Sequence, residues 1–99
     1  MAYNVVVLPT ARKEFQEITE YLAFQGKATL GSFLNEYERQ LNLIASGSVT
    51  YRLSRFAEIA ELGYRMAPVN SYLFLYVLED DTVTIAHFFH QSQDYARLV

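Results

Sequence analysis

The feature that most constrains the fold is an eight-residue run, Tyr72–Glu79, with the sequence YLFLYVLE. Successive side chains of a β-strand point to opposite faces of a sheet, and here nearly every position is apolar. A strand of this kind is buried on both faces, so it belongs in the middle of a sheet. The fold therefore needs a neighbouring strand on each side of this run and cover over both of its faces.

Turn residues flank this run and predict a three-stranded antiparallel meander. The pair Asn70-Ser71 precedes the run and Asp80-Asp81 follows it, and both pairs are typical of tight turns. Before the first turn lies GYRMAPV, which begins at Gly63 and reaches its proline at position 68. After the second turn comes TVTIAHFFH, residues 82–90. Both segments are predicted to pair with the central run.

The N-terminal half carries one strand pattern and two helical patterns. Residues 3–8 (YNVVVL) form a β-branched run that stops at Pro9, which predicts a buried strand, and Thr10 is placed to cap the helix that follows. Apolar residues then recur three and four positions apart up to Gly26, and again from about Thr29 to Ser46. The two stripes are Ala11, Phe15, Ile18 and Leu22, and then Leu30, Phe33, Leu34, Tyr37, Leu41 and Ile44.

The elements follow one another as strand, helix, helix and three strands (βααβββ). The connector between the helices is short, so they are expected to form an antiparallel hairpin. We expect an α+β fold in which residues 1–99 form a single domain, with the hairpin across one face of a mostly antiparallel sheet. Residues 48–62 are predicted to be a loop with one helical turn or a short extended piece.

Composition excludes several classes of protein. The 99 residues include no cysteine and two histidines, which excludes a disulfide scaffold and a thiolate zinc site. His87 and His90 lie three positions apart on one predicted strand, so they point to opposite faces and cannot share a metal. The net charge of −3 disfavours non-specific nucleic-acid binding. With no cofactor motif, membrane-spanning run or signal peptide, we expect a metal-free and cofactor-free protein of the cytoplasm.

A group of basic and polar residues offers candidate chemistry. Arg65 alternates with large apolar neighbours, and His90 ends the last strand. A groove shared by these two would hold a fixed cation and a proton donor, the parts that metal-free phosphoryl transfer needs. The plainer interpretation is that the arginines are solvated or paired with acids, and it is favoured for Arg52, Arg55 and Arg97. His87 is interpreted as a hydrogen-bonded structural residue.

The aromatic residues of the last two strands also have two interpretations. The simpler one assigns them to the core and its rim. The other places them on the sheet face without helices, as an apolar platform for another protein chain. The residues concerned are Tyr72, Phe74, Tyr76, Phe88 and Phe89.

One ordered set of residues runs through the C-terminal half. The pair Tyr64-Arg65 is followed by Pro68, by a strand ending in an aromatic at Tyr76, and by a short acidic turn. The last strand then closes on His90, with Asp94 four residues further on. This order resembles the RelE/ParE superfamily of toxins from bacterial type II toxin–antitoxin modules. The Pro-x-Ala at residues 9–11, after the first strand, is similar to that family as well.

The resemblance implies a βααβββ fold and a cognate antitoxin that wraps the toxin. It also implies one of two activities. RelE-like members cut mRNA on the ribosome, whereas ParE-like members poison DNA gyrase by protein contact. The histidine–aspartate closure and the proline after the arginine strand look more like the ParE branch. His87 stands where many relatives have arginine, and the only lysines are Lys13 and Lys27, so the ribonuclease branch is the second choice.

Each interpretation assigns different residues. As a gyrase inhibitor, the chain is expected to bind its partners through Tyr72, Phe74, Tyr76, Tyr95, Arg97 and Leu98. As a ribonuclease, it would use Arg65 to stabilise the phosphate and His90 or Tyr95 to move protons. A third alternative is a non-toxic homologue that keeps the fold as a binding module. The antitoxin is expected to cover the apolar sheet face or the groove between sheet and helices, and a homodimer of the chain alone through the same surface is a further alternative.

Overall fold

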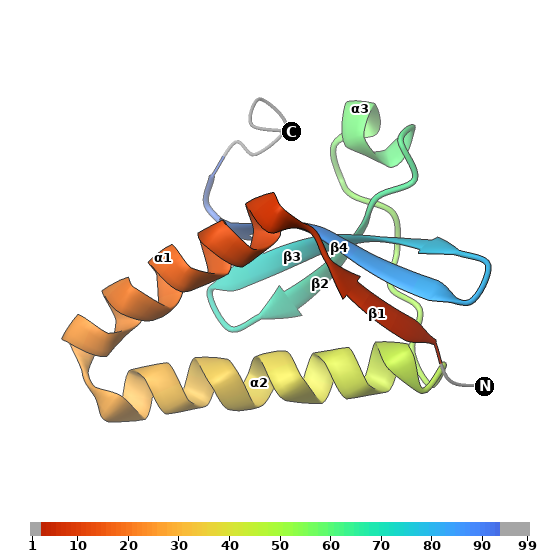
Figure 1. Ribbon diagram of the computed structural model, residues 1–99. Coiled ribbons are helices and arrows are strands. Elements are labelled where there is room, and N and C mark those ends of the chain that lie inside the picture. Colours follow the sequence, from red (N-terminus) through yellow and green to blue (C-terminus); the bar gives the residue numbers. More distant parts are fainter. Residues whose placement is uncertain (1–2, 94–99) are drawn as a thin grey trace.

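The computed structural model describes residues 3–93 and has the predicted order of elements. Strand β1 (Asn4–Val7) leads into helices α1 (Pro9–Gln25) and α2 (Lys27–Ala45), and the short helix α3 (Ala57–Ala60) follows. Strands β2 (Arg65–Val69), β3 (Tyr72–Glu79) and β4 (Thr82–His90) complete the chain. Figure 1 shows the two long helices as a hairpin beside the sheet, with α3 on the side of the sheet opposite α2. The α+β prediction is confirmed.

The four strands form one sheet in the order β1-β4-β3-β2. The pairs β2–β3 and β3–β4 are antiparallel, so the predicted meander with β3 inside the sheet is confirmed. Among residues 3–93, strand β1 pairs only with β4, in parallel. The prediction that β1 is a buried strand is wrong, because an edge position leaves Val5 and Val6 37% and 45% exposed.

The helices begin slightly earlier than their sequence patterns indicated. Helix α1 starts at Pro9 itself, and Thr10 makes no capping hydrogen bond, so the predicted Thr10 cap is wrong. Proline suits the first helical position because its fixed φ is helical and the missing N–H has no partner there anyway. Gly26 ends α1 and precedes α2, with a φ of 132° that a side chain would disfavour.

The helical hairpin packs on one face of the sheet through aromatic side chains. The Phe15 ring lies 5.7 Å from that of Phe33 and 5.2 Å from that of Phe88, between centroids. Tyr37 of α2 reaches Phe74 of β3 at 5.8 Å. Leu34 was predicted to belong to the buried apolar stripe of the second helix, and this is wrong because Leu34 is 38% exposed.

A polar side chain, Gln40, takes a buried place on the sheet side of α2 and is 3% exposed. Its side-chain oxygen accepts a hydrogen bond from the Tyr51 hydroxyl, and the Tyr51 backbone N–H donates to the hydroxyl of Tyr76 at 3.0 Å. Burial raises the pKa of the Tyr76 phenol above its usual value. This network anchors the start of the loop between α2 and α3 to the core.

The network predicts the effect of removing one hydroxyl. Tyr51→Phe leaves the buried oxygen of Gln40 without its donor, which we expect to lower the free energy of unfolding by about 1–3 kcal/mol. Tyr21→Phe is the matched control, since Tyr21 is 57% exposed. Urea unfolding followed by circular dichroism measures both variants. Equal stability of the two would show that the Gln40 oxygen finds another donor.

The second face of the sheet is covered in part by the chain itself. Helix α3 and its neighbours pack on this face, and α3 is the single helical turn predicted within residues 48–62. A short extended piece is also present, since Leu53 forms an isolated β-bridge with Arg65. The buried members of this second cluster are Ile59, Leu73, Leu75 and Phe89, with Phe56, Tyr64 and Met66 packed against them. The alternative of an open platform on the last two strands is therefore wrong at Phe89, and the simpler interpretation, which assigned this residue to the core, is confirmed.

Candidate functional site

The structure separates the two residues of the predicted catalytic groove. Arg65 pairs with Tyr76 across β2 and β3, whereas His90 pairs with Tyr72 across β3 and β4. Four residues along β3 and two strand spacings place their Cα atoms about 16 Å apart, from a rise of about 3.3 Å per residue and a spacing of about 4.8 Å. The prediction that they share one groove is wrong, because the pairing register places them at different ends of the sheet.

Arg65 is held by the backbone of the preceding loop. Its Nη1 atom donates to the carbonyl oxygen of Tyr51 at 2.8 Å, and the residue is half-buried. Tyr51 is itself fixed by its bonds to Gln40 and Tyr76. Part of the guanidinium is thus already committed to joining the loop to the edge of β2.

His90 is oriented by the turn that follows it. Its Nδ1 atom lies 3.1 Å from the backbone nitrogen of Ser92 and 2.6 Å from the Ser92 hydroxyl. A backbone N–H can only donate, so Nδ1 accepts and the neutral ring carries its proton on Nε2. The ring packs edge-on against Tyr72 at 5.1 Å. His90 therefore offers a hydrogen-bond donor and no second lone pair for a general base.

His87 has the structural role expected of it. It stacks on Phe89 at 5.2 Å, on the sheet face opposite the one where His90 meets Tyr72, which confirms that the two histidines diverge. Its Nδ1 lies 3.2 Å from Oε1 of Glu14, and the same oxygen accepts the backbone N–H of Phe88 at 3.1 Å.

Glu14 is a functional contact of α1 that the sequence analysis did not single out. Strand β1 pairs with β4 only as far as Ile85, so the outer edge of β4 beyond that point needs other acceptors. Glu14 supplies one of them from the helix that follows β1. The sequence contained one indication of this role, because the first predicted strand is shorter than the last and cannot pair with it along its whole length.

The aromatic residues predicted to bind a partner lie mostly in the core. Phe74 and Tyr76 are fully buried in the cluster beneath the helices, so placing them on a free sheet face is wrong. Tyr72 is partly exposed, and its ring contacts Phe33 of α2 at 5.4 Å. The other predicted contacts, Tyr95, Arg97 and Leu98, lie outside the described residues.

Arg55, another residue of the basic group, has structural contacts. Its Nη2 atom donates to the carbonyl oxygen of Gln91 at 3.1 Å, and its guanidinium lies over the Phe56 ring at 5.0 Å. These contacts agree with the interpretation of Arg55 as a structural residue. Within residues 3–93, no three acidic or histidine side chains gather where they could hold a metal ion.

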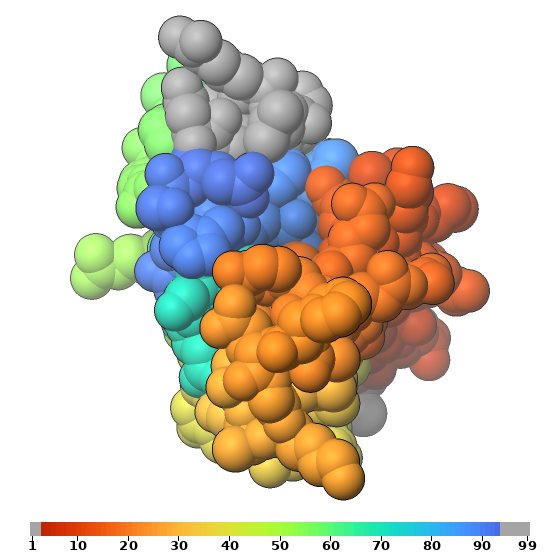
Figure 2. Space-filling model, turned by 90° about the vertical axis from the view of Figure 1, so that its left-hand side faces the viewer, coloured from red at the N-terminus to blue at the C-terminus, as the bar shows by residue number. Residues whose placement is uncertain are grey.

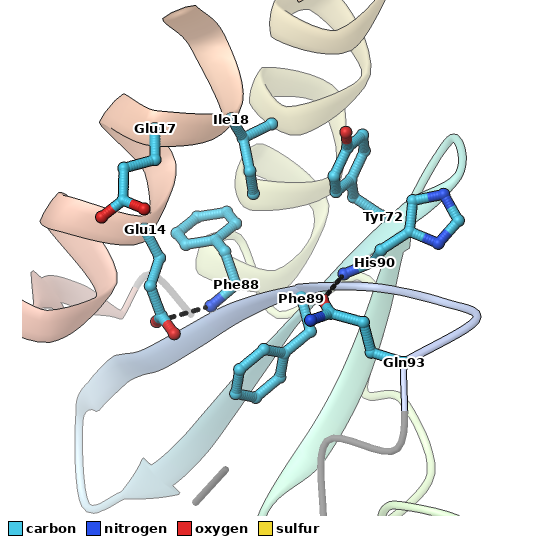
Figure 3. A pocket seen from close by; sticks show the side chains of 8 residues that line it. All are labelled: Glu14, Glu17, Ile18, Tyr72, Phe88, Phe89, His90 and Gln93. Atoms are coloured by element: carbon cyan, nitrogen blue, oxygen red, sulfur yellow. Dashed lines mark hydrogen bonds between the residues drawn. The ribbon is translucent and has the colours of Figure 1, made fainter. Parts of the chain in front are cut away.

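A groove of about 400 Å³ lies between α1 and the ends of β3 and β4. Figure 2 shows the two sides of this region, with the blue end of β4 beside the orange turns of α1. Its lining is half apolar and half polar, the aromatic residues Phe88 and Phe89 are almost fully buried, and Glu14 and Glu17 stand on the α1 side (Figure 3). The lining residues are Glu14, Glu17, Ile18, Tyr72, Phe88, Phe89, His90 and Gln93.

The electrostatics of this groove bear on what it can bind. Two carboxylates line one wall, and His90 lies at the other end, where its Nδ1 accepts the backbone N–H of Ser92. A phosphodiester brought here would meet like charge, which is unfavourable. A cation would meet opposite charge over an apolar floor.

None of the helices in the described part of the chain is long and apolar enough to cross a membrane.

Solved structures with the same fold come from toxin–antitoxin systems. A chromosomal ParDE system from P. aeruginosa matches with a TM-score of 0.66 and 11% identity, over 90% of this chain and 96% of that one. The DinJ–YafQ toxin–antitoxin complex of E. coli matches with 0.62 and 12%, over 99% and 98% of the two chains. YafQ from E. coli strain BL21(DE3) gives 0.61 and 13%, over 91% and 94%. These likenesses show the shared fold.

The sequence itself gives the family. No curated protein matches the chain significantly. The family model for the ParE toxin of the type II toxin–antitoxin system parDE, however, matches residues 5–95, which is nearly the whole chain. Together with the βααβββ order and the sheet topology, this match identifies the protein as a member of the ParE toxin family, within the RelE/ParE superfamily of type II toxins.

Proposed function

We propose that this toxin inhibits DNA gyrase by protein–protein contact and is neutralised by a cognate antitoxin. The observation that carries the proposal is the match to the ParE family over residues 5–95. The ParE-like features of the last strand, with its histidine at position 90 and aspartate at 94, favour the same branch. A toxin–antitoxin complex among the structural neighbours supports an antitoxin as the second partner.

The ribonuclease alternative receives less support from the described residues. Arg65 and His90 lie at different ends of the sheet, and one nitrogen of Arg65 is bonded to the Tyr51 carbonyl. The groove beside His90 carries two carboxylates, which oppose the approach of an RNA backbone. A proton shuttle and a phosphate-binding cation are therefore not brought together in residues 3–93.

The gyrase contact is assigned to the C-terminal segment. Tyr95, Arg97 and Leu98 supply an aromatic ring, a guanidinium and an aliphatic side chain, which are typical anchors of protein interfaces. Such a contact needs no catalytic group and no cofactor. The cytoplasmic location expected from the sequence fits this target and stays a prediction.

Induced expression with separate labelling of DNA and protein synthesis tests the proposal. We expect incorporation of labelled thymidine to fall first, while labelled methionine is still incorporated, and DNA-damage signalling to rise. Co-expression of the antitoxin encoded beside the toxin should restore both. Arrest of protein synthesis with cut transcripts would contradict the proposal and favour the ribonuclease. No arrest of either kind would identify a non-toxic homologue.

A further inference from the structure

The outer edge of β4 is longer than the strand that covers it. The register of β1 on β4 runs as far as Val7 opposite Ile85, and the chain then leaves the sheet at Pro9 to form α1. Strand β4 continues to His90 and stays paired with β3 on its other side. Within residues 3–93, no strand lies along the outer side of this last part of β4. It is therefore an edge, where the strand of another chain could pair.

The sequence of β4 makes such an edge prone to self-association. Residues 82–90 (TVTIAHFFH) contain no lysine, arginine, aspartate or glutamate, and they contain no proline. Apolar edge strands without these residues pair readily with one another, and natural sheets usually place a charged side chain at such an edge. A charge that protects this edge must come from another element of the chain.

Two side chains from outside the strand occupy the outward amides of this edge (Figure 3). The N–H groups of Phe88 and His90 lie two positions apart, so they point to the same side of β4. The Phe88 N–H donates to Oε1 of Glu14 at 3.1 Å, and the His90 N–H donates to the side-chain oxygen of Gln93 at 2.7 Å. These two N–H groups are the donors that an added strand would use.

Helix α1 supplies the side chain that blocks Phe88, and it treats the end of β1 in the same way. Arg12 donates from Nε to the carbonyl oxygen of Val7 at 3.1 Å. A cation thus binds a carbonyl and an anion binds an amide, and both are charge-assisted hydrogen bonds. The groove of about 400 Å³ beside Glu14 is the space that an added strand would enter. The edge is accessible, and side chains keep its donors occupied.

We propose that Glu14 and Gln93 keep the toxin monomeric by blocking the free edge of β4 against a second copy of the chain. A second copy is the expected occupant because two identical edges can pair in antiparallel fashion about a two-fold axis, where each strand offers the other the same groups. The two Glu14 carboxylates would then lie in one interface and repel each other. The proposal depends on neither the gyrase target nor the antitoxin.

Analytical ultracentrifugation of the purified full chain, over a wide range of concentration, tests the proposal. We expect the unaltered chain to stay at its monomer mass of 11.4 kDa. The double variant Glu14→Ala/Gln93→Ala should associate, and its apparent mass should rise about twofold, as for a symmetric dimer. Glu17→Ala is the matched control, since Glu17 lines the same groove from the same helix but is exposed, and it should stay monomeric.

Hydrogen exchange, measured by NMR in dilute solution, shows whether the edge has opened in a folded protein. The Phe88 and His90 amides of the double variant should exchange about tenfold faster, as for the loss of one hydrogen bond. The amide of Leu75, inside the sheet on β3, should keep its rate.

Three results would overturn the proposal. They are association of the unaltered chain, association of Glu17→Ala as strong as that of the double variant, and a folded double variant that exchanges fast yet stays monomeric. If the double variant does not fold, Gln93→Ala decides alone, because Gln93 follows the last strand and leaves α1 untouched. A monomeric Gln93→Ala variant with a fast His90 amide would then contradict the proposal, and its association would support it.

Discussion

Phe74→Ala should lower the free energy of unfolding by about 4 kcal/mol, and the melting temperature by roughly 15–30 °C for a domain of this size. Phe74 is fully buried at the centre of the aromatic cluster that joins both helices to the sheet. Its ring lies 5.8 Å from that of Tyr37 and 5.6 Å from that of Phe88. Removing the ring leaves a cavity, which could close only if the aromatic rings of α2, β3 and β4 around it moved together.

Phe24→Ala is the matched control for this prediction. Phe24 lies near the end of α1 and is 94% exposed, so its removal should leave the melting temperature nearly unchanged. Thermal unfolding of both variants, followed by circular dichroism, gives the comparison. A small effect of Phe74→Ala, close to that of Phe24→Ala, would mean that the helices do not pack on this face of the sheet.

Truncation after Gln93 should abolish growth inhibition, whereas Arg65→Ala should weaken it much less. The truncation removes Tyr95, Arg97 and Leu98, and the loss of interface anchors worth about 2 kcal/mol or more each amounts to at least about thirtyfold in affinity. Arg65 belongs to the edge of β2 and is bonded to the Tyr51 carbonyl, so its loss acts mainly on the loop. Growth on inducing plates, over a series of inducer concentrations, ranks the variants.

Two controls make this ranking interpretable. Each variant must keep the far-ultraviolet circular dichroism spectrum of the full chain, so that loss of toxicity is not loss of folding. Arg39→Ala removes an arginine that is exposed and pairs with Glu36 within α2, and it should stay fully toxic. If Arg65→Ala abolishes toxicity while the folded truncation stays toxic, the ribonuclease interpretation gains the advantage.

The meander and the helical hairpin could be predicted because each depends on local periodicity. Strand β3 is apolar at every buried position on both faces, and that pattern alone required a strand on each side of it. The turns at Asn70 and Asp80 adopt φ values of 55° and 53°, which asparagine and aspartate tolerate. Gly26 ended α1 for the same kind of local reason.

The features that could not be predicted depend on which distant segments meet. Nothing in the run of valines says that β1 pairs in parallel with β4 at an edge, and the burial of those valines was overestimated as a result. The register of β2 and β4 on β3 separates Arg65 from His90, and register is a tertiary property.

Two buried details depend on tertiary contacts in the same way. Gln40 is polar and would be expected on the surface, yet it is buried because the hydroxyl of Tyr51, from the loop after α2, donates a hydrogen bond to its side chain. Cover for the second sheet face came from residues 56–64, where the sequence has no clear period. The prediction that Phe74 and Tyr76 form a free platform was wrong. The sequence of β3 shows which residues share a face, but not which of the two faces the helices cover, and the contact between Tyr37 and Phe74 that decides this is a tertiary one.

Supercoiling of relaxed plasmid by purified gyrase, with the purified toxin added, tests the central claim most directly. The account predicts that the full chain inhibits supercoiling, that Arg65→Ala still inhibits, and that the chain truncated after Gln93 does not. Addition of the antitoxin should restore supercoiling. Unimpaired supercoiling in the presence of folded toxin, together with cleavage of mRNA on purified ribosomes by the same preparation, would contradict the account.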